Sequence, residues 1–329
     1  MTSDETMSNE DRMIARFFAP LATHSGALGL SDDAAVVAPP PGCDLVLTAD
    51  GLVGGMHFFT DDAADTIARK ALRVNLSDLA AKGAAPLGFL LTLALPPEVD
   101  EAWLGEFARG LAEDAAHYQC PLLGGDSVRT PGPVTISVTM TGCVPSGDMV
   151  RRAGATPGDV VFVSGSIGDA ALGLALRKGA AWKLDESGRR HLADRYLLPQ
   201  PRNKLADAVR THASAAMDVS DGLAGDLAKL CRVSQVAAEI EVARVPLSEA
   251  ARAVITVDSA VLEMALTGGD DYEILCTVAP DNCESFRAAA RAAAIPVSEI
   301  GRIVAGEGTR FIGSDGAALV FRRAAFSHF

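Results

Sequence analysis

Aspartate residues recur beside short apolar runs, and glycine flanks several of them. Five segments share this pattern: SDDAAVV with Asp32 and Asp33, LVLTAD with Asp50, PLLGGD with Asp126, AAMDVSD with Asp218 and Asp221, and ALTGGDD with Asp270 and Asp271. A carboxylate beside apolar residues is unfavourable unless it is paired or bound to a metal ion. Oxygen ligands without matching lysines suit magnesium, which fills the rest of its shell with water and substrate phosphates. The segments therefore predict a site for magnesium and a triphosphate.

Each aspartate also has a plainer interpretation, as a turn former or a helix cap. Ser220 with Asp221, for example, could cap a helix that follows. Asp78 differs because NLSDLAAKG predicts a helix, in which Asn75 lies three residues earlier on the same face. The repetition of one pattern in five segments favours the metal site, since glycine lets backbone and ligand approach closely.

Familiar nucleotide-binding motifs are absent from the sequence. It contains no G-x-x-x-x-G-K-[ST] loop and no H-R-D or D-F-G set of the protein kinases. SGSIGD, at residues 164–169, predicts either a phosphate-binding helix N-terminus or a tight structural turn. Arg151 and Arg152 could neutralise phosphate charge or form a solvated surface pair. His57 is the only histidine inside a dense motif, GGMHFF.

Composition argues against several classes of protein. The formal net charge is -13, from 42 acidic and 29 basic residues, which disfavours a general nucleic-acid binder. No apolar run reaches the roughly 20 residues that span a bilayer, and the polar N-terminus predicts no signal peptide. The six cysteines form no C-x-x-C pair, so we expect buried free thiols and a cytoplasmic location.

Alternating helix and strand patterns predict two α/β or α+β domains. The loop-rich segment PSGDMVRRAGATPG, residues 145–158, is the predicted boundary, and residues 1–12 are expected to be a disordered lead-in. Apolar periodicity and turn residues predict the individual elements. Helices are expected at 13–22, 63–81, 101–118, 168–177, 191–197, 221–231 and 284–294, and strands at 36–37, 45–48, 87–95, 121–123, 134–144, 160–164, 215–219, 237–242, 272–278 and 311–312.

Taken together and in order, six motifs resemble those of the thiamine-monophosphate kinase family, within the aminoimidazole ribonucleotide synthetase-like superfamily. The motifs are SDDAAVV, LTADGLVGGMHF, KALRVNLSDLAAKGA, LLGGDSVR, AMDVSDGLAGDL and TGGDDYE, and the resemblance covers residues 13–329. It implies a two-domain fold in which residues 1–148 form an α/β domain that binds ATP and Mg²⁺ and dimerises through its sheet. Residues 149–329 then form a C-terminal α+β domain, and the active site lies in the cleft between the two.

The resemblance also implies an activity. ATP would give its γ-phosphate directly to thiamine monophosphate, forming thiamine diphosphate and ADP in the final step of thiamine diphosphate biosynthesis, without a phosphoenzyme. Catalysis would rest on positioning and on charge neutralisation by Mg²⁺. The implied partners are ATP, thiamine monophosphate and a second copy of the chain in a homodimer.

The resemblance implies a role for each matching residue. The magnesium set is Asp33, Thr48, Ala49 through its backbone, Asp50, Asp78, Asp126, Asp218 and Asp221, of which Asp50 and Asp218 are the catalytic pair. The ATP contacts are Gly125, Asp126, Arg152 and Ser220. The substrate contacts are His57, Asp270 and Arg323.

The chain departs from the family pattern at four places. SDD stands where GDD is usual, TADG replaces T-D-T/S, Asp270 replaces a glutamate, and Arg323 stands where an aromatic residue often lies. The last two departures fall on the thiamine contacts rather than on the metal core.

Two alternatives to the kinase remain. One is another member of the superfamily. A selenophosphate synthetase would need a reactive cysteine or selenocysteine near a glycine-rich N-terminal motif, and the sequence shows neither there. The carbamoyl-handling hydrogenase maturation factor ends in cysteine, whereas this chain ends in SHF. The other is a protein that binds a metal–nucleotide complex without turnover, which has little need of so many aspartates.

Overall fold

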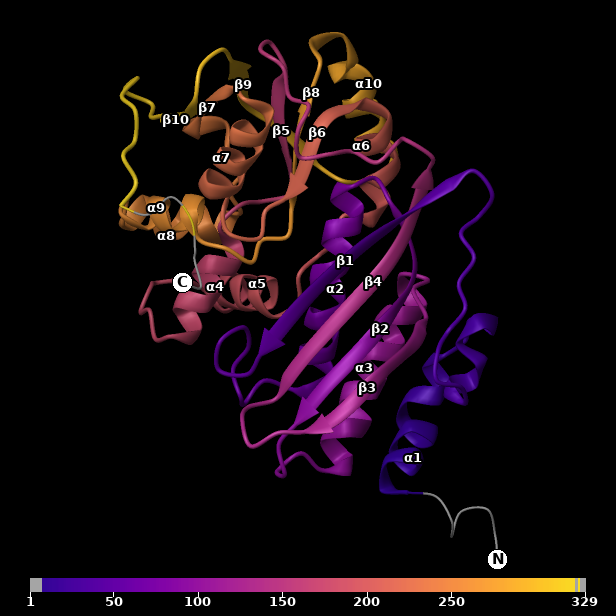
Figure 1. Ribbon diagram of the computed structural model, residues 1–329. Helices are drawn as coiled ribbons and strands as arrows, with labels where there is room; N and C mark the ends of the chain where they lie inside the picture. The colour runs from indigo at the N-terminus through magenta and orange to yellow at the C-terminus, as the bar shows by residue number, and fades with distance from the viewer. Residues whose placement is uncertain (1–7, 323–324, 326–329) are drawn as a thin grey trace, which may run out of the picture. The chain divides into compact units, whose positions relative to one another are not determined.

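Two compact units make up the protein, and each has its own β-sheet (Figure 1). The computed structural model describes residues 8–322 and 325. The first unit comprises Met1–Leu79 and Ala85–Gly147, and the second comprises Ala80–Ala84 and Asp148–Phe329.

The sheet of the first unit is mixed, with the strand order β1-β4-β2-β3. β4 pairs antiparallel with β1 and β2, whereas β3 runs parallel to β2. Burial alternates along β4, because Ile136, Val138 and Met140 are buried and the residues between them are less so. One face is therefore packed and the other open. The strands are β1 (Cys43–Val53), β2 (Ala85–Leu95), β3 (Leu122–Arg129) and β4 (Thr135–Pro145).

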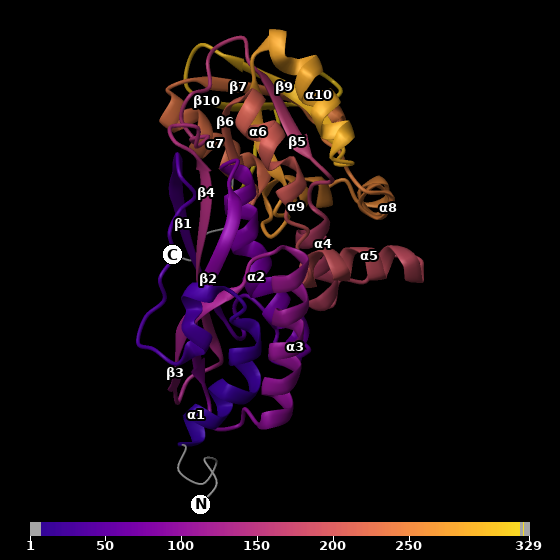
Figure 2. The ribbon, with the colours of Figure 1, turned by 90° about the vertical axis from the view of Figure 1, so that its right-hand side faces the viewer.

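Two long helices, α2 (Ala64–Ala81) and α3 (Glu101–His117), cover the packed face (Figure 2). Apolar residues at helical spacing on α2, such as Ile67, Ala71 and Val74, are buried. A buried ion pair joins the helices, with Arg73 Nε of α2 lying 2.5 Å from Asp114 Oδ2 of α3.

Short helices precede this sheet. They are α1 (Asn9–Met13), the π-helical turn η2 (Ile14–Phe18), and the 3-10 turns η3 (Ala19–Leu21) and η4 (Ser25–Leu30). The prediction of a disordered lead-in is wrong for residues 9–12. Ser8 and Asp11 form a capping box, which satisfies amides at the start of α1 and lets the helix begin early.

The sheet of the second unit has six strands in the order β10-β7-β9-β5-β8-β6. β10 and β7 are parallel, and the other neighbouring pairs are antiparallel. The strands are β5 (Val160–Ser164), β6 (Ala213–Asp218), β7 (Ala237–Glu241), β8 (Ile274–Val278), β9 (Val297–Val304) and β10 (Gly308–Ile312).

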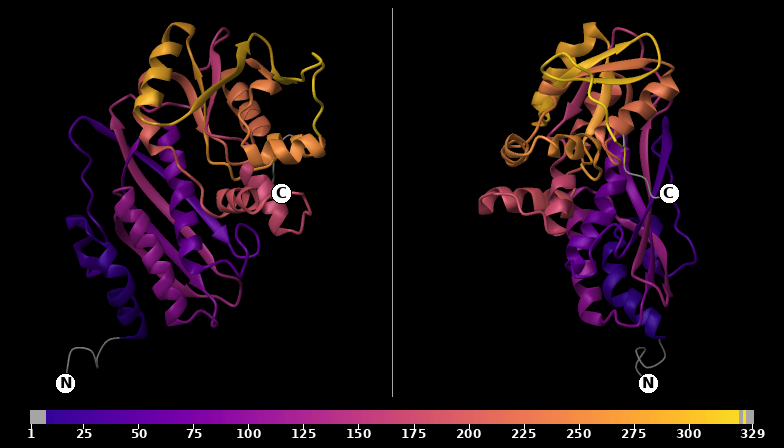
Figure 3. Two further views of the ribbon diagram at one scale, coloured as in Figure 1. Left: turned by 180° about the vertical axis from the view of Figure 1, so that it is seen from behind. Right: turned by 90° about the vertical axis from the view of Figure 1, so that its left-hand side faces the viewer.

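Both faces of this second sheet are buried. Successive residues of β5 enter different cores, since Val161 packs with α7 (Leu223–Ser234) and Phe162 with α6 (Ala206–His212) and α10 (Cys283–Ala292). Figure 3 shows these layers from two further sides. The short 3-10 turns of this unit are η5 (Asn203–Leu205), η6 (Val242–Arg244) and η7 (Pro280–Asn282).

Four further helices of the second unit share a separate apolar cluster that includes Leu172, Leu192 and Val254. They are α4 (Asp169–Arg177), α5 (Glu186–Leu197), α8 (Glu249–Val257) and α9 (Val261–Thr267). All six cysteines are free, as predicted, but only four are buried, since Cys43 and Cys143 are half-buried. Within the part of the chain that the structure describes, no helix is both long and apolar enough to cross a membrane.

Some predicted boundaries are wrong. Residues 36–37 form no strand. β1 continues well past residue 48, so Asp50 lies inside the strand, and Asp126 likewise lies inside β3. β9, α6, α8 and α9 were not predicted. The sequence of β9 lacks the alternation of buried and exposed residues that predicts a strand. A register shift beside β5 leaves Ile300 and Gly301 buried in succession.

Phe286 tests the packing of the second unit. It is fully buried and meets Phe162 edge-on, with ring centroids 5.2 Å apart. Phe286→Ala is expected to lower the free energy of unfolding by about 3–5 kcal/mol, because it leaves a cavity. Chemical denaturation measures this. Val257→Ala, at a side chain that is 82% exposed, is the control and should change the value by less than about 0.5 kcal/mol. A loss below about 1 kcal/mol for Phe286→Ala would contradict the described core.

Candidate active site

Two loops that carry predicted site residues lie side by side in the second unit. β6 and β8 are antiparallel neighbours, with Asp218 opposite Ile274. Beyond this pair, three main-chain hydrogen bonds continue the contact into the loops. They run from Val219 N to Glu273 O at 2.8 Å, from Tyr272 N to Val219 O at 2.8 Å, and from Asp270 N to Ser220 O at 2.9 Å.

These bonds bring Asp218, Ser220, Asp221 and Asp270 into one pair of loops. Asp218 is buried and is the last residue of β6, one residue before the predicted end of the strand, and the other three are half-buried. The glycines between them have a structural reason. A Cβ on Gly269 would lie 2.4 Å from Ser220 O, so only glycine allows the loops this close.

A buried carboxylate from α7 shapes the first loop. Asp226 Oδ2 accepts hydrogen bonds from Ser220 N at 3.0 Å and from Asp221 N at 2.9 Å. Lys229 Nζ lies 2.8 Å from Asp226 Oδ1 and also pairs with Asp221. Burial raises the pKa of Asp226, and the Lys229 hydrogen bond partly offsets this.

Sequence reasoning missed both of these helix residues. Asp226 and Lys229 lie three apart on one helix face in SDGLAGDLAK, and this spacing is the signal that could have found them. Burial lowers the pKa of Lys229, but its bonds to Asp221 and Asp226 raise it above the usual value. A protonated lysine therefore accompanies Asp221, a predicted magnesium ligand.

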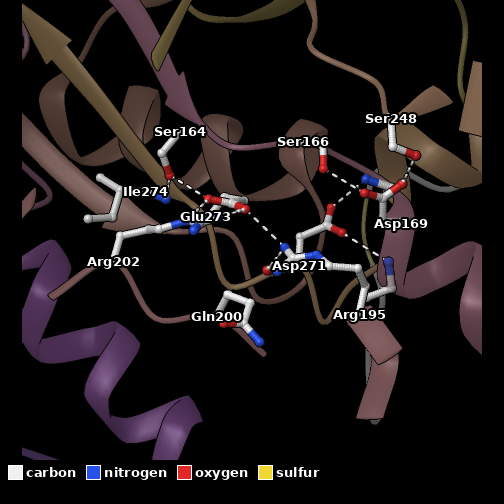
Figure 4. Close-up of polar contacts among 12 residues, drawn as sticks. Ser164, Ser166, Asp169, Arg195, Gln200, Arg202, Ser248, Asp271, Glu273 and Ile274 are labelled. Atoms are coloured by element: carbon white, nitrogen blue, oxygen red, sulfur yellow. Dashed lines mark hydrogen bonds and ion pairs between the residues drawn. The ribbon is translucent and has the colours of Figure 1, made fainter. Parts of the chain in front are cut away.

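The second loop contains two buried carboxylates, Asp271 and Glu273, which bind it to the rest of the second unit (Figure 4). Asp271 Oδ2 accepts from Gly168 N at 2.7 Å, and its Oδ1 accepts from Ala170 N at 3.2 Å. Burial raises the pKa of Asp271 well above that of an exposed carboxyl, and the amide of Gly168 and the charge of Arg195 partly offset this.

Glu273 has two cationic neighbours and a hydroxyl donor. Arg195 Nη2 lies 2.9 Å from Glu273 Oε1, and Arg202 Nε donates to Oε2 at 2.6 Å. Ser164 Oγ donates to the same carboxylate at 2.6 Å and accepts from Ile274 N at 2.8 Å. Such pairing offsets the free-energy penalty of burying a full charge.

SGSIGD at 164–169 is a structural turn. Of the donors at the start of α4, Gly168 N and Ala170 N donate to Asp271, so the helix N-terminus already binds a carboxylate of its own chain. Its serines are also engaged, since Ser164 donates to Glu273 and Ser166 to Asp169. The phosphate-loop alternative is not supported by these contacts.

In the first unit, β1 and α2 bring oxygen ligands together. Thr48 Oγ1 donates to Asp78 Oδ2 at 2.5 Å. Asp50 lies two residues beyond Thr48 and so on the same face of β1, and it is half-buried. Asp78 lies on a helix, as predicted. Asn75 Oδ1, one turn earlier on α2, is buried without a hydrogen-bond partner.

Asp126 lies on the other outer strand of the same sheet. The register places Gly125 beside Leu91, Leu91 opposite Val138, and Val138 opposite Asp50. Three strand spacings separate the ends of this row, which is roughly 14 Å. Within one chain, a single metal ion therefore cannot contact both Asp50 and Asp126. Gly125 is needed for packing, because a Cβ there would lie 1.9 Å from Leu91 O.

Five predicted residues remain to be placed. Asp33 is exposed in a loop before β1, and Ala49 is exposed on β1. His57 follows β1, and its Nδ1 accepts from Val53 N at 3.0 Å, so the ring proton of the neutral form is on Nε2. Arg152 is exposed in the second unit, and Arg323 lies outside the described residues.

The predicted metal set is thus divided between the units. Asp218 and Asp221 belong to the second unit, and the other six belong to the first. Among residues 8–322 and 325, no group of three or more His, Cys, Asp or Glu side chains is arranged to hold a metal ion.

Comparison with known proteins defines the class of this chain. The family model for the AIR synthase related protein N-terminal domain matches residues 31–144, and that for the C-terminal domain matches residues 156–314. The chain is an AIR synthase-related protein, and the predicted two-domain fold class is confirmed. Its relatives narrow this class further, and it belongs to the thiamine-monophosphate kinase family.

Three relatives carry this assignment. The thiamine-monophosphate kinase of Caulobacter vibrioides is 47% identical over 90% of this chain and 84% of its own length. The crystal structure of thiamine-monophosphate kinase from Stenotrophomonas maltophilia K279a is 40% identical, with a TM-score of 0.83 over 94% of this chain and 96% of its own. A structure described as AaThiL complexed with AMPPCP and TMP is 31% identical, with a TM-score of 0.77 over 91% of each chain.

Lys229→Met tests the support of the first loop. The substitution leaves Asp226 buried without its cation, so we expect a loss of about 1–3 kcal/mol in the free energy of unfolding. Chemical denaturation gives the value, and Lys183→Met, at an exposed lysine, is the matched control. Equal effects of the two substitutions would show that Lys229 does not stabilise the loop.

Proposed function

We propose that this chain phosphorylates thiamine monophosphate with ATP, forming thiamine diphosphate and ADP in thiamine diphosphate biosynthesis. The observation that carries this proposal is the joined pair of loops 218–222 and 268–273. They hold Asp218 and Ser220, expected at metal and ATP, beside Asp270, expected at the substrate. The similarity to a protein complexed with AMPPCP, an ATP analogue, and TMP supports the same pair of substrates.

The acceptor of this reaction needs no general base. A phosphate monoester has a second pKa of about 6, so its oxygens are already ionised at neutral pH. One of them forms a bond to the γ-phosphorus, the bond from that phosphorus to the bridging oxygen breaks, and ADP leaves with the electron pair. The obstacle is repulsion between two anions, so positioning and charge neutralisation are what the protein supplies.

The first-unit oxygens fit a magnesium ion by their chemistry. Thr48, Asp50 and Asp78 offer hard oxygen donors, and the buried Asn75 Oδ1 has no hydrogen-bond partner. Bound there, Mg²⁺ would neutralise phosphate charge. The full proposed set is Asp33, Thr48, Ala49, Asp50, Asp78, Asp126, Asp218 and Asp221.

The other proposed roles belong to substrate contacts. Ser220 offers a hydroxyl and Arg152 a positive charge to ATP, whose binding we also assign to Gly125 and Asp126. His57 and Asp270 contact thiamine monophosphate in this proposal, together with Arg323. We further propose that residues 1–148 bind ATP and residues 149–329 complete the enzyme, and that the protein works in the cytoplasm.

Asp218→Asn is the sharpest test of the proposed chemistry. Purified protein incubated with ATP, Mg²⁺ and thiamine monophosphate should yield thiamine diphosphate, quantified by chromatography. Asp218→Asn and Asp50→Asn should each reduce turnover by about 100-fold or more with an unchanged circular dichroism spectrum, because each removes one charge at the phosphates. Wild-type protein that consumes no ATP and forms no product would refute the proposal. Near-normal turnover of either variant would refute the role of the substituted aspartate as a metal ligand.

The open face of the first sheet is the proposed dimer interface. Leu45 and Leu47 of β1, Leu90 of β2 and Val128 of β3 are exposed, and the register puts all four on the face that α2 and α3 leave uncovered. An apolar patch of this kind is typical of a protein interface. A second copy of the same face suits it, because a two-fold interface is self-complementary.

Leu47→Asp is expected to convert the dimer to a monomer, because it places a charge within this patch. Sedimentation velocity across a dilution series measures the change. Val257→Asp, at an exposed apolar side chain on α8, is the control and should leave the dimer intact. A monomeric wild type, or a Leu47→Asp variant that still dimerises, would exclude this interface.

A further inference from the structure

The loop 268–273 has an unusual backbone at Asp270. Asp270 and Tyr272 both have positive φ angles, of 73° and 50°. Residues other than glycine avoid this left-handed region, and they keep it only where the surroundings determine the conformation. The contacts of residue 271, between the two, are therefore informative.

Asp271 holds the loop through both its side chain and its main chain. Its carboxylate is completely buried and accepts from Gly168 N at 2.7 Å and Ala170 N at 3.2 Å, at the start of α4. Its carbonyl oxygen accepts from Arg195 Nη2 at 3.1 Å. In Figure 4 the Asp271 side chain points toward the N-terminal end of α4. Asp271 is thus bonded to groups outside both loops of the candidate site.

Two further anchors flank Asp271. On one side, Asp270 N donates to Ser220 O at 2.9 Å. On the other, Glu273 is fixed by Arg195 and by Arg202 Nε at 2.6 Å. The peptide of Asp270 therefore lies between the first loop and a buried polar network. The side chain of Asp270 is half-buried, whereas the side chain of Asp271 is completely buried.

We propose that Asp271 is a positioning residue for substrate binding. Its buried carboxylate holds Asp270 in the left-handed conformation, so that the Asp270 carboxylate is presented to thiamine monophosphate. This inference rests on the proposed function and deepens it.

Asp271→Asn is the test, since it keeps the shape of the side chain. The new amide offers one acceptor where the carboxylate offers two, so one of the two bonds to α4 is lost. We expect kcat/KM for thiamine monophosphate to fall about tenfold or more, with the KM for ATP changed by less than about twofold. Asp169→Asn is the matched control. Asp169 is also a fully buried carboxylate, but its hydrogen bonds go to Ser166, His191 and Ser248.

A double-mutant cycle separates positioning from a general structural role. If Asp271 acts through Asp270, the effect of Asp271→Asn should shrink to less than about twofold in the Asp270→Asn background. Additive losses, an equal loss for ATP, or the same loss in Asp169→Asn would overturn the inference. Arg195→Lys, which weakens the bond to the Asp271 carbonyl and keeps the charge beside Glu273, replaces Asp271→Asn in the cycle if that variant does not fold.

Hydrogen exchange gives a readout that does not depend on activity. Asp271→Asn should speed amide exchange in the segment 266–275 and leave α10 unchanged, because the loop loses an anchor while the core remains. If the wild type makes no thiamine diphosphate, the proposed function fails, but faster exchange in this segment still supports the positioning role. Unchanged exchange overturns it.

Discussion

The antiparallel pairing of β6 with β8 determines the candidate site in the second unit. These strands carry two aspartate motifs that are far apart in the sequence, and the pairing continues beyond them as main-chain bonds between residues 219–220 and 270–273. Gly222 and Gly269 make this possible, because a Cβ at either would collide with the opposite loop. The acidic side chains are thus set by backbone contacts that do not depend on any ligand.

Buried carboxylates make this arrangement rigid. Asp226, Asp271 and Glu273 are each removed from water, and each is compensated by amide donors or cations of the same unit. Removing any one partner leaves a buried polar group without compensation, which is far more costly than losing an exposed contact. The residues proposed to bind substrates are therefore supported by a network of buried carboxylates that has little freedom to rearrange. Such support suits a reaction that depends on positioning.

In the first unit, the candidate oxygen ligands come from two strands and a helix rather than from two neighbouring loops. Thr48 and Asp78 meet across β1 and α2, and the same sheet carries Asp126 on its far edge. Since Asp50 of β1 and Asp126 of β3 lie three strand spacings apart in one chain, a site built from them suits a long, multiply charged ligand such as a triphosphate. On α2, near Asp78, the buried Asn75 Oδ1 has no hydrogen-bond partner, so it is a further polar oxygen in the interior of the first unit.

The sequence alone predicted which kinds of residue could do the chemistry, and it determined the two-domain α/β and α+β class and most of the long elements. Residues such as Ile67, Ala71 and Val74 predict their helix by local spacing, and motif order indicates the family. Tertiary structure decided the rest. Whether Asp50 ends a strand depends on how far β4 continues beside it, and whether SGSIGD binds phosphate depends on Asp271, about a hundred residues away. Burial and hydrogen-bond partners are properties of the folded chain, so no local pattern contains them.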